Sequence, residues 1–517
     1  MQTAPTCANG RGLSLEAIDL SDNELNDHAR QSAASVQRLA LQWLSERTAD
    51  PAIRRRLRQV AKHHEIEPPN KRELPELLNR FQDHRWWRRA LRKRFRVIEH
   101  DAILSGRVHK HAAPYVSDKA LRRAVRDRRR VAELLASLDA INQSTGQVLP
   151  LDELSNASLA NPANRRAALM ARIKGIEQHA KARGAEALFF TITCPSRMHA
   201  RHVSGGANER YDGTAPRHAQ AYLNKLWRRA MRKLLHDGIG VSGLRVVEPH
   251  HDGCPHWHVL AFAAPEHAQA LTETLRAYAL AEAPNEAGAT QHRFTVERID
   301  PAKGSAVGYV AKYVSKSIDG EGVETDDETG DGGSASSQRI VTWARVWGVR
   351  QFQFFGVPAI TPTRELYRVD RVALPGNALQ AAHEACKAND YAAWLDACEA
   401  HALSFRVEYI ERPSSRYGGE TSRRICGLAA SACDLPSTVQ LVTRSDEWRI
   451  EPRRSEAAGG EFAAPWTRFN NCAPVDFIEI FGTNPGNERE RREGARGVAA
   501  SRPPPRRPAT QIARSPC

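Results

Sequence analysis

Two histidines separated by one residue occur in the segment EPHHDGCPHWHVLAF. Alternate side chains of a β-strand point to the same face, so His256 and His258 are expected to lie side by side and to chelate one metal ion. Glu248, expected across a hairpin from His256, is the predicted third ligand. The alternatives are Asp252 and His250. A His-x-His pair alone is weak support, because histidines are also ordinary half-buried polar residues.

Two tyrosines four residues apart occur in the segment GSAVGYVAKYVSKS. In a helix, Tyr309 and Tyr313 lie on one face. The period of 3.6 residues puts Lys312 and Lys316 on that side, while the valines gather on the opposite side. Core aromatics would instead be expected among the valines. The pattern therefore favours a phosphate-binding face over a packing role.

Together the two segments indicate a phosphodiester reaction. A divalent cation, Mg²⁺ or Mn²⁺, would act as a Lewis acid on the scissile phosphate. A tyrosine oxygen would attack, leaving a 5′-phosphotyrosyl link and a free 3′ hydroxyl. Because a phenol has an ordinary pKa of about 10, its ionisation needs help from the metal, Lys312 or Lys316. The alternatives are a metallonuclease that uses water and a DNA-binding regulator whose tyrosines are structural.

The elements around these segments predict an α+β fold. Strands are expected at residues 187–193, 244–247, 256–262 and 291–299, and helices at 161–183, 220–236, 265–283 and 302–317. Asp300 and Pro301 are suited to the start of the last helix. The order strand–helix–strand–strand–helix–strand is that of a ferredoxin-like sandwich with a central antiparallel sheet.

A strongly basic helical region is expected before this fold. The segment RWWRRALRKRFR, residues 85–96, carries seven basic residues and no acid. Arginine and lysine side chains neutralise DNA phosphates. The residues predicted to contact DNA are Arg85, Arg88, Arg89, Arg92 and Lys93. Trp86 and Trp87 either stack on bases or form part of a small helical core.

Charge and composition limit the classes of partner. The 517 residues carry a formal charge of +15, which favours a polyanion such as DNA or RNA. No stretch approaches the roughly 18 apolar residues of a spanning helix, and the N-terminus does not resemble a secretory signal. A cytoplasmic, DNA-associated protein without a membrane partner is expected. The nine cysteines form no Cys-x-x-Cys pair, and Cys194 and Cys254 are expected to be small buried residues.

Changes in composition divide the chain into parts. They are a weakly ordered N-terminus (1–32), a basic helical DNA-contacting region (33–160), a catalytic domain (161–319), a mobile acidic loop (320–338), a continuation of the catalytic domain (339–375), an accessory region (376–484) and a disordered tail (485–517). The loop and the tail are predicted because they are polar and contain few apolar residues.

Four motifs resemble those of a known family. CPHWHVLAF and GYVAKYVSK are similar to the His-hydrophobic-His and paired-tyrosine motifs of HUH endonucleases. ALFFTITCPSRMHA, VVEPHHDGCPHWHVLAF, IDPAKGSAVGYVAKYVSKSIDG and WGVRQFQFFG resemble, in this order, motifs of the replication gene A proteins of tailed phages of the P2 type. The resemblance covers about residues 161–367.

The resemblance implies an HUH-type fold and the initiation of rolling-circle replication at a single-stranded or supercoiled DNA origin. It also implies that Tyr309 and Tyr313 are the nucleophiles and that His256 and His258 bind the metal. Conjugative relaxases typically complete this metal site with a third histidine, whereas an acidic residue is predicted here. No Walker A sequence is present, so strand separation is expected to depend on a host helicase. A plasmid replication initiator or a mobilisation relaxase would share the same chemistry.

Overall fold

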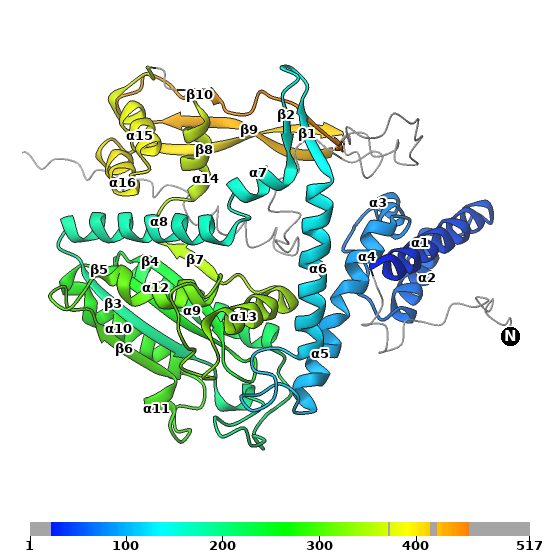
Figure 1. Cartoon of the computed structure of the whole chain (residues 1–517), viewed down its shortest axis with the longest axis horizontal. Coiled ribbons are helices and arrows are strands. Elements are labelled where there is room, and N and C mark those ends of the chain that lie inside the picture. The colour runs from blue at the N-terminus through cyan, green and yellow to red at the C-terminus, as the bar shows by residue number, and fades with distance from the viewer. Residues whose placement is uncertain (1–21, 371–372, 414–420, 454–517) are drawn as a thin grey trace, which may run out of the picture.

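The structure, a computed structural model, describes residues 22–370, 373–413 and 421–453. These residues form helices and antiparallel sheets, so the fold is mixed α+β. Figure 1 shows a bundle of N-terminal helices on one side of the long helix α6 (Asp118–Ala136) and the central sheet on the other. The predicted disordered tail, and most of the segment predicted to be weakly ordered at the N-terminus, lie outside the described residues.

The N-terminal helices form a bundle with its own apolar core. They are α1 (Asp22–Ser45), α2 (Asp50–His63), α3 (Leu74–Phe81) and α4 (His84–Lys93), and α5 (Phe95–Leu104) follows. Asp83 caps α4, because its carboxylate accepts backbone N–H groups of the first turn. Trp87 is fully buried, and its indole N–H donates to the Phe81 carbonyl at 2.7 Å. Trp87 therefore belongs to the core, and its ring is not exposed for stacking on a base.

Five antiparallel strands form the central sheet, in the order β6-β3-β5-β4-β7. They are β3 (Glu186–Thr193), β4 (Ser242–Pro249), β5 (Pro255–Ala263), β6 (Phe294–Arg298) and β7 (Phe352–Phe355). Successive side chains of a strand point to opposite faces. Phe190 and Trp257 therefore pack into the core on one face of the sheet, and Phe189 and Leu260 pack into the core on the other.

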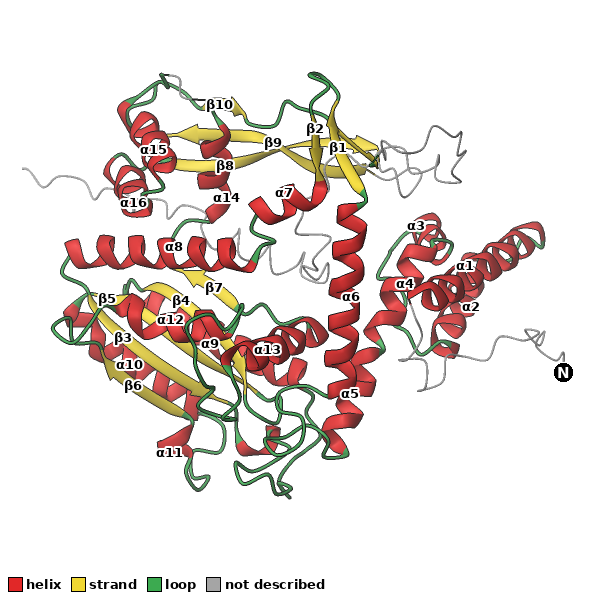
Figure 2. Ribbon diagram, in the orientation of Figure 1, coloured by secondary structure: helices red, strands yellow, loops and turns green. Residues whose placement is uncertain are grey.

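Helices cover both faces of this sheet. The helices α9 (Pro216–His236) and α10 (Pro265–Leu280) pack on the face of Trp257, and α8 (Pro162–Ala182) and α12 (Ala306–Lys316) pack on the opposite face. Figure 2 shows the sheet as the yellow strands below α8. The succession β3–α9–β4–β5–α10–β6 follows the predicted order of strands and helices. Cys194 and Cys254 are buried, as predicted.

Several element boundaries differ from the prediction, and two of the differences bear on the site. The strand predicted at 291–299 is preceded by a short helix, α11 (Ala289–His292), and begins at Phe294. The tyrosine helix begins at Ala306, because its cap is Ser305, whose hydroxyl accepts the backbone N–H of Gly308. Asp300 instead accepts the backbone N–H of Ala302 in a separate turn.

The segment predicted to be a mobile acidic loop makes buried contacts. Thr325 pairs with Gly332 in an isolated bridge, and Asp326 is only 1% exposed. The helix α13 (Gly333–Trp347) begins inside the segment and buries Trp343 in the core. An acidic composition suggests exposure to solvent, but a carboxylate can be buried when a cation pairs with it.

Two three-stranded sheets complete the described structure. The first joins β1 (Leu138–Asn142), β2 (Val148–Pro150) and β11 (Trp448–Pro452), so the predicted helical region 33–160 also contains strands. The second joins β8 (Ser404–Pro413), β9 (Thr421–Ser431) and β10 (Val439–Val442). The remaining helices are α7 (Leu151–Ala157), α14 (Ile360–Arg368), α15 (Asn377–Ala388) and α16 (Tyr391–Ala400). Within the described ranges, every helix is too short or too polar to span a membrane.

Candidate active site

The β4–β5 hairpin brings the three predicted metal ligands together. Glu248 pairs directly with His256 across the hairpin, and His258 follows on the same face of β5. The Nε2 atoms of His256 and His258 are 2.9 Å apart, and Glu248 Oε2 is 3.9 Å from His258 Nε2. One ligand atom of each residue lies within 4.8 Å of the others. These three residues, here called the triad, are close enough for one metal ion to contact all of them.

The chemistry of the triad fits a divalent cation. Burial lowers the pKa of His256 well below its usual range and that of His258 to about 3, so both imidazoles are neutral and keep a nitrogen lone pair. Thr191 Oγ1 lies 3.2 Å from His258 Nδ1, a contact that orients the ring with Nε2 toward His256. Burial raises the pKa of Glu248 to about 7, and the charge of Lys316 opposes this rise. Imidazole nitrogens suit metals such as Zn²⁺ and Fe²⁺, and carboxylate oxygens suit Mg²⁺ and Mn²⁺, so this mixed set of ligands can hold a divalent cation.

A buried network surrounds the Glu248 carboxylate. Lys316 Nζ lies 3.7 Å from Glu248 Oε2 and 2.8 Å from Asp326 Oδ1. Ser317 Oγ donates to Glu248 Oε1 at 3.0 Å, and the Tyr115 hydroxyl donates to Asp326 Oδ2 at 2.6 Å. Lys316 was expected on the polar face beside the tyrosines, but its side chain is buried between these carboxylates. It therefore balances their charge instead of facing solvent.

The helix α12 packs through its valines and leaves both tyrosines partly exposed. Val314 is fully buried, whereas Tyr309 and Tyr313 are half-buried. The ring of Tyr313 stacks on His258 with the centroids 3.8 Å apart. Tyr309 lies one turn earlier, and its ring centroid is 6.5 Å from that of Phe189. The valines are therefore buried more deeply than the tyrosines, but both tyrosine rings also pack against the sheet, and Tyr313 contacts a histidine of the triad.

The two phenols have different electrostatic surroundings. Burial, and then the Glu248 carboxylate, raise the pKa of Tyr313. A hydrogen bond with Glu297 raises the pKa of Tyr309. Both phenols are therefore protonated at neutral pH in these surroundings, and attack on a phosphate requires that the proton be removed.

The second lysine of the tyrosine helix differs from Lys316. Lys312 is exposed and forms an ion pair with Asp327, which is exposed as well. The Lys312 Nζ atom lies 5.9 Å from the centroid of the Tyr313 ring. Lys312 therefore remains at the surface next to a tyrosine, as the helical spacing predicted, whereas Lys316 does not.

The alternative third ligands lie beside the triad and contact other partners. Asp252 Oδ2 lies 3.4 Å from His199 Nδ1. The ring centroids of His250 and His256 are 4.0 Å apart, and His250 Nδ1 lies 3.2 Å from Glu328 Oε1. Among the described residues, the triad is the one group of three potential ligands whose ligand atoms all lie within 4.8 Å of one another.

Several residues of this site were not predicted from the sequence. They are Tyr115, His199, Asp326 and Glu328. His199 lies within the motif ALFFTITCPSRMHA, so the sequence carried a signal for it. Tyr115 is 211 positions from Asp326, and no local pattern connects the two. Asp326 and Glu328 lie in the segment 320–338, which its acidic composition predicted to be a mobile loop.

Comparison with known proteins identifies the family. Residues 13–321 match the bacteriophage replication gene A protein (GPA) family. The chain belongs to this family. It is 36% identical over 448 residues to the replication gene A protein of Escherichia phage 186, an alignment that covers 82% of this chain and 63% of that protein.

Two further relatives carry similar descriptions. The chain is 35% identical over 422 residues to the replication protein of Haemophilus phage HP1, covering 76% of this chain and 53% of that protein. It is 33% identical over 498 residues to a probable replication endonuclease from a prophage-like region of Salmonella paratyphi A, covering 90% of this chain and 60% of that protein. The chain thus spans between 53% and 63% of the length of these relatives. No solved structure gives a significant match.

In this gene A family member, the residues predicted to contact DNA lie on α4, apart from the triad. They are Arg85, Arg88, Arg89, Arg92 and Lys93. Arg89 and Lys93 are exposed. Burial, and then the neighbouring Arg92, lower the pKa of Arg88. Figure 1 shows α4 on the other side of α6 from the central sheet, so these side chains are not part of the triad's surroundings.

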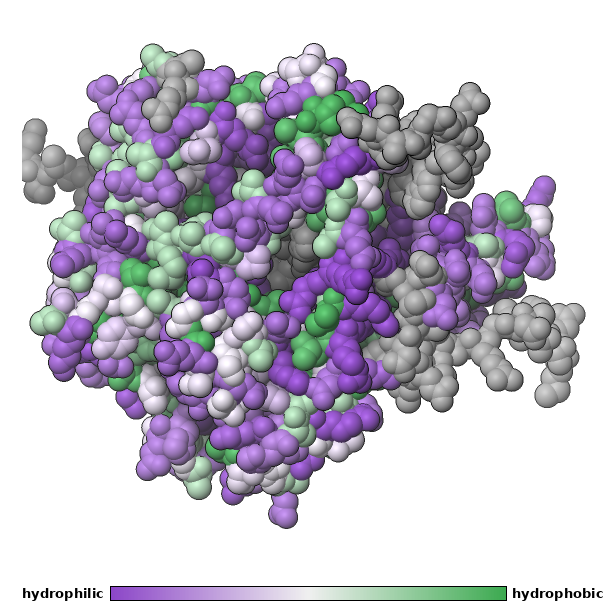
Figure 3. Space-filling model, in the orientation of Figure 1, coloured by the Kyte–Doolittle hydropathy of each residue, from purple (hydrophilic) through white to green (hydrophobic). Residues whose placement is uncertain are grey.

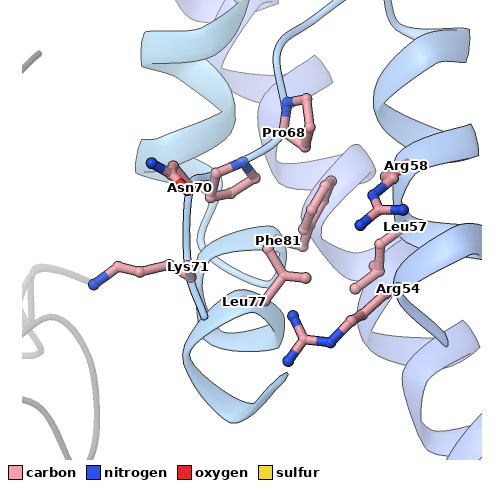
Figure 4. A pocket seen from close by; sticks show the side chains of 9 residues that line it. Arg54, Leu57, Arg58, Pro68, Asn70, Lys71, Leu77 and Phe81 are labelled. Carbon is pink, nitrogen blue, oxygen red and sulfur yellow. The ribbon is translucent and has the colours of Figure 1, made fainter. Parts of the chain in front are cut away.

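The helical bundle also contains a hollow of about 270 Å³ (Figure 4). It lies between α2, the segment before α3, and α3 itself. Its lining residues are Arg54, Leu57, Arg58, Pro68, Pro69, Asn70, Lys71, Leu77 and Phe81. None of them belongs to the triad or to the tyrosine helix, so we assign no part of the chemistry to this hollow.

Proposed function

We propose that this gene A family member initiates the replication of phage or prophage DNA by cutting one strand with a tyrosine and staying attached to the new 5′ end. The observation that carries the proposal is the contact of Tyr313 with His258, because it joins a nucleophilic side chain to three potential metal ligands. Membership of the gene A family and the similarity to a probable replication endonuclease support DNA as the substrate.

We infer that the central sheet and its helices form an HUH-type ferredoxin-like sandwich. The succession β3–α9–β4–β5–α10–β6 and the spatial order β6-β3-β5-β4 support this class. The strand β7 extends the sheet beyond β4. In this arrangement the histidines lie on a central strand, and the tyrosine helix packs on the face that carries them.

The triad would hold Mg²⁺ or Mn²⁺, which would polarise the scissile phosphate and offset its negative charge. Thr191 orients His258, and Lys316 and Ser317 orient Glu248. The Tyr313 oxygen forms a bond to phosphorus while the bond from phosphorus to the 3′ oxygen breaks. The phenol gives up its proton and the departing 3′ oxygen takes one up. The number of phosphate ester bonds does not change, so the reverse reaction can rejoin the strand.

Tyr309 would serve a second cut. Rolling-circle replication needs one cut to start and another to release the finished circle, and a tyrosine that is already esterified cannot attack again. Tyr309 and Tyr313 are one helical turn apart, which puts their Cβ atoms roughly 6 Å from each other. Lys312 lies on the exposed side of the same helix and would contact the phosphate.

The proposal includes DNA and protein partners. The substrate would be a single-stranded or supercoiled origin, and the basic side chains of α4 would bind phosphates outside the site. A host replicative helicase would separate the strands, since this chain carries no Walker A sequence.

Label transfer tests this function. Single-stranded DNA spanning the replicon's origin, labelled on the 3′ side of the cut, is incubated with the protein and Mn²⁺ and then separated on a denaturing gel. We expect the label to migrate with the protein, and EDTA to prevent both cutting and transfer. If the DNA is cut but the labelled fragment carries no protein, the proposal is wrong and the protein is a metallonuclease that uses water.

A further inference from the structure

The two histidines of the triad are held in different ways. Thr191 Oγ1 lies 3.2 Å from His258 Nδ1, and this contact orients the His258 ring. The corresponding Nδ1 atom of His256 is buried, and no group of the described residues forms a hydrogen bond with it. The second ring nitrogen of a metal-binding histidine usually has such a partner, which fixes the orientation of the ring. The orientation of His256 must therefore come from packing.

The ring of His250 packs on the ring of His256. The two centroids are 4.0 Å apart, and the planes are inclined by 34°. The backbone of His250 is fixed as well, because its N–H donates to the Cys254 carbonyl at 2.7 Å in the turn between β4 and β5. A second ring, that of His199, lies with its centroid 5.1 Å from that of His250. His250 thus covers His256 from a hydrogen-bonded turn.

Glu328 holds His250 in this position. Glu328 Oε1 lies 3.2 Å from His250 Nδ1 and accepts the backbone N–H of His251 at 2.7 Å. An ionised carboxylate only accepts hydrogen bonds, so the proton of this contact belongs to His250 Nδ1. Charged side chains mostly stay at the surface, as the hydrophilic side chains over α6 do (Figure 3), whereas the Glu328 side chain is only 22% exposed. One inward-facing carboxylate therefore binds both histidines of the turn.

The acidic segment around Glu328 is itself anchored. The backbone N–H of Glu328 donates to Asp326 Oδ1 at 3.0 Å. Lys316 Nζ of the tyrosine helix lies 2.8 Å from the same oxygen, and the Tyr115 hydroxyl donates to Asp326 Oδ2 at 2.6 Å. Hydrogen bonds on both sides therefore fix the position of Glu328 between the tyrosine helix and the β4–β5 turn.

We propose that His250 and Glu328 are positioning residues for the metal ligand His256, an inference that rests on the metal-dependent cutting proposed above. The His250 ring keeps His256 Nε2 directed toward the other two ligands of the triad, and Glu328 keeps the His250 ring in place. His250 is not itself a ligand, because it does not belong to the group whose ligand atoms lie within 4.8 Å of one another. What His256 needs from His250 is a flat ring and not a nitrogen lone pair.

Two substitutions at position 250 separate packing from metal ligation. His250→Ala removes the ring, whereas His250→Phe keeps a flat ring without nitrogen atoms. The Mn²⁺ affinity of the full chain is measured by isothermal titration calorimetry, and circular dichroism checks the fold. We expect His250→Ala to weaken Mn²⁺ binding by about tenfold, the lower end of the effect of partners of metal ligands, and His250→Phe to retain most of the affinity. Equal losses in the two variants would make His250 a ligand and overturn the inference, as would wild-type affinity in His250→Ala.

A double variant tests the link between Glu328 and His250. If Glu328 acts through His250, Glu328→Ala weakens Mn²⁺ binding, and His250→Ala/Glu328→Ala binds no more weakly than His250→Ala alone. Glu324→Ala changes an exposed residue of the same segment and should bind Mn²⁺ as the wild type does. Losses that add in the double variant would show that Glu328 acts on the metal independently of His250, which contradicts the proposed arrangement.

A measurement on the metal-free protein distinguishes this inference from the proposed function. Histidines labelled with carbon-13 at Cε1 give one NMR signal for each imidazole, and His256→Gln identifies the signal of His256. An aromatic ring shifts the signal of a proton close to its face, so the His256 signal should move in His250→Ala and return toward its original position in His250→Phe. An unmoved signal in His250→Ala would overturn the inference. Absence of Mn²⁺ binding by the wild type would instead count against the proposed function, and the NMR result would still decide whether His250 positions His256.

Discussion

The ring of Tyr313 stacks on the imidazole of His258, with the centroids 3.8 Å apart and the planes inclined by 27°. Tyr309, one turn earlier on the same helix, has its ring 6.5 Å from Phe189 and packs farther along the same face of the sheet. The two tyrosines are therefore not equivalent in this structure, although the sequence gives them the same spacing and the same helical face.

The first prediction concerns this asymmetry. Tyr313→Phe should slow the first strand cut on the order of 100-fold, or about 2.7 kcal/mol in activation free energy, because it removes the hydroxyl of the tyrosine whose ring contacts the triad. Tyr309→Phe should retain the first cut and fail to complete circles. Single-turnover cleavage of a labelled oligonucleotide and an assay for circles measure the two steps. Tyr409→Phe, an exposed tyrosine on β8, is the control. If Tyr313→Phe and Tyr309→Phe make the first cut at equal rates, the stacking of Tyr313 on His258 does not select the nucleophile.

The second prediction concerns the histidines. His256→Ala combined with His258→Ala should abolish cleavage and leave DNA affinity largely intact, because affinity comes mostly from phosphate contacts made by arginine and lysine. EDTA should have the same effect on the wild type. Cleavage and fluorescence anisotropy are measured in parallel, with His236→Ala as the control, since the His236 side chain is 89% exposed. Full cleavage by the double variant in EDTA would rule out a metal at the triad.

The third prediction concerns the acidic ligand. Glu248→Gln should weaken Mn²⁺ binding more than Asp252→Asn does, because Glu248 faces both histidines whereas Asp252 pairs with His199. Both changes keep the shape of the side chain and remove its charge. Isothermal titration with Mn²⁺ gives the two affinities directly. A larger loss for Asp252→Asn would mean that the third ligand has been assigned to the wrong residue.

The fourth prediction concerns the network around Glu248. Asp326→Asn removes the carboxylate charge that lies 2.8 Å from Lys316, so Lys316 pairs with Glu248 alone and competes with the metal for it. Partners of metal ligands affect metal affinity by about 10- to 100-fold. We expect the Mn²⁺ concentration for half-maximal cleavage to rise by about tenfold while the maximal rate changes little. Asp331→Asn, an exposed residue of the same segment, is the control. If the Mn²⁺ concentration for half-maximal cleavage does not change, Asp326 has only a structural role.

The fifth prediction concerns α4. Neutralising Arg88, Arg89, Arg92 and Lys93 together should lower the affinity for any DNA sequence and flatten its salt dependence. Each lost contact with duplex DNA reduces the salt slope by about 0.9. Anisotropy titrations at several salt concentrations measure the slope, and circular dichroism checks the fold of the helical bundle. An unchanged slope with lost sequence preference would make α4 a reader of bases instead.

Local patterns in the sequence predicted the parts of the site that lie on single elements. The alternation around His256 and the turn before it predicted the β4–β5 hairpin, including Glu248 opposite His256. The spacing of the valines in α12 predicted the face that packs on the sheet. These predictions succeeded because the period of a strand or a helix is fixed by backbone geometry.

These local patterns could not predict contacts between segments that are distant in the sequence. The hydrogen bond from Tyr115 to Asp326 joins residues 211 positions apart. Lys316 lies on the polar side of α12 in a helical projection, yet Asp326 and Glu248 bury it. Periodicity indicates which side of a helix is polar, but it does not reveal whether a second segment covers that side.

Mapping of the covalent adduct tests the central claim most directly. After reaction with single-stranded origin DNA and Mn²⁺, the protein is digested with nuclease and trypsin and analysed by mass spectrometry. The account predicts a nucleotide linked through phosphate to the tyrosine of the peptide Tyr313–Lys316, with the peptide Gly304–Lys312 modified when Tyr313 is replaced by Phe. Cut DNA together with unmodified tyrosine in both peptides would contradict it.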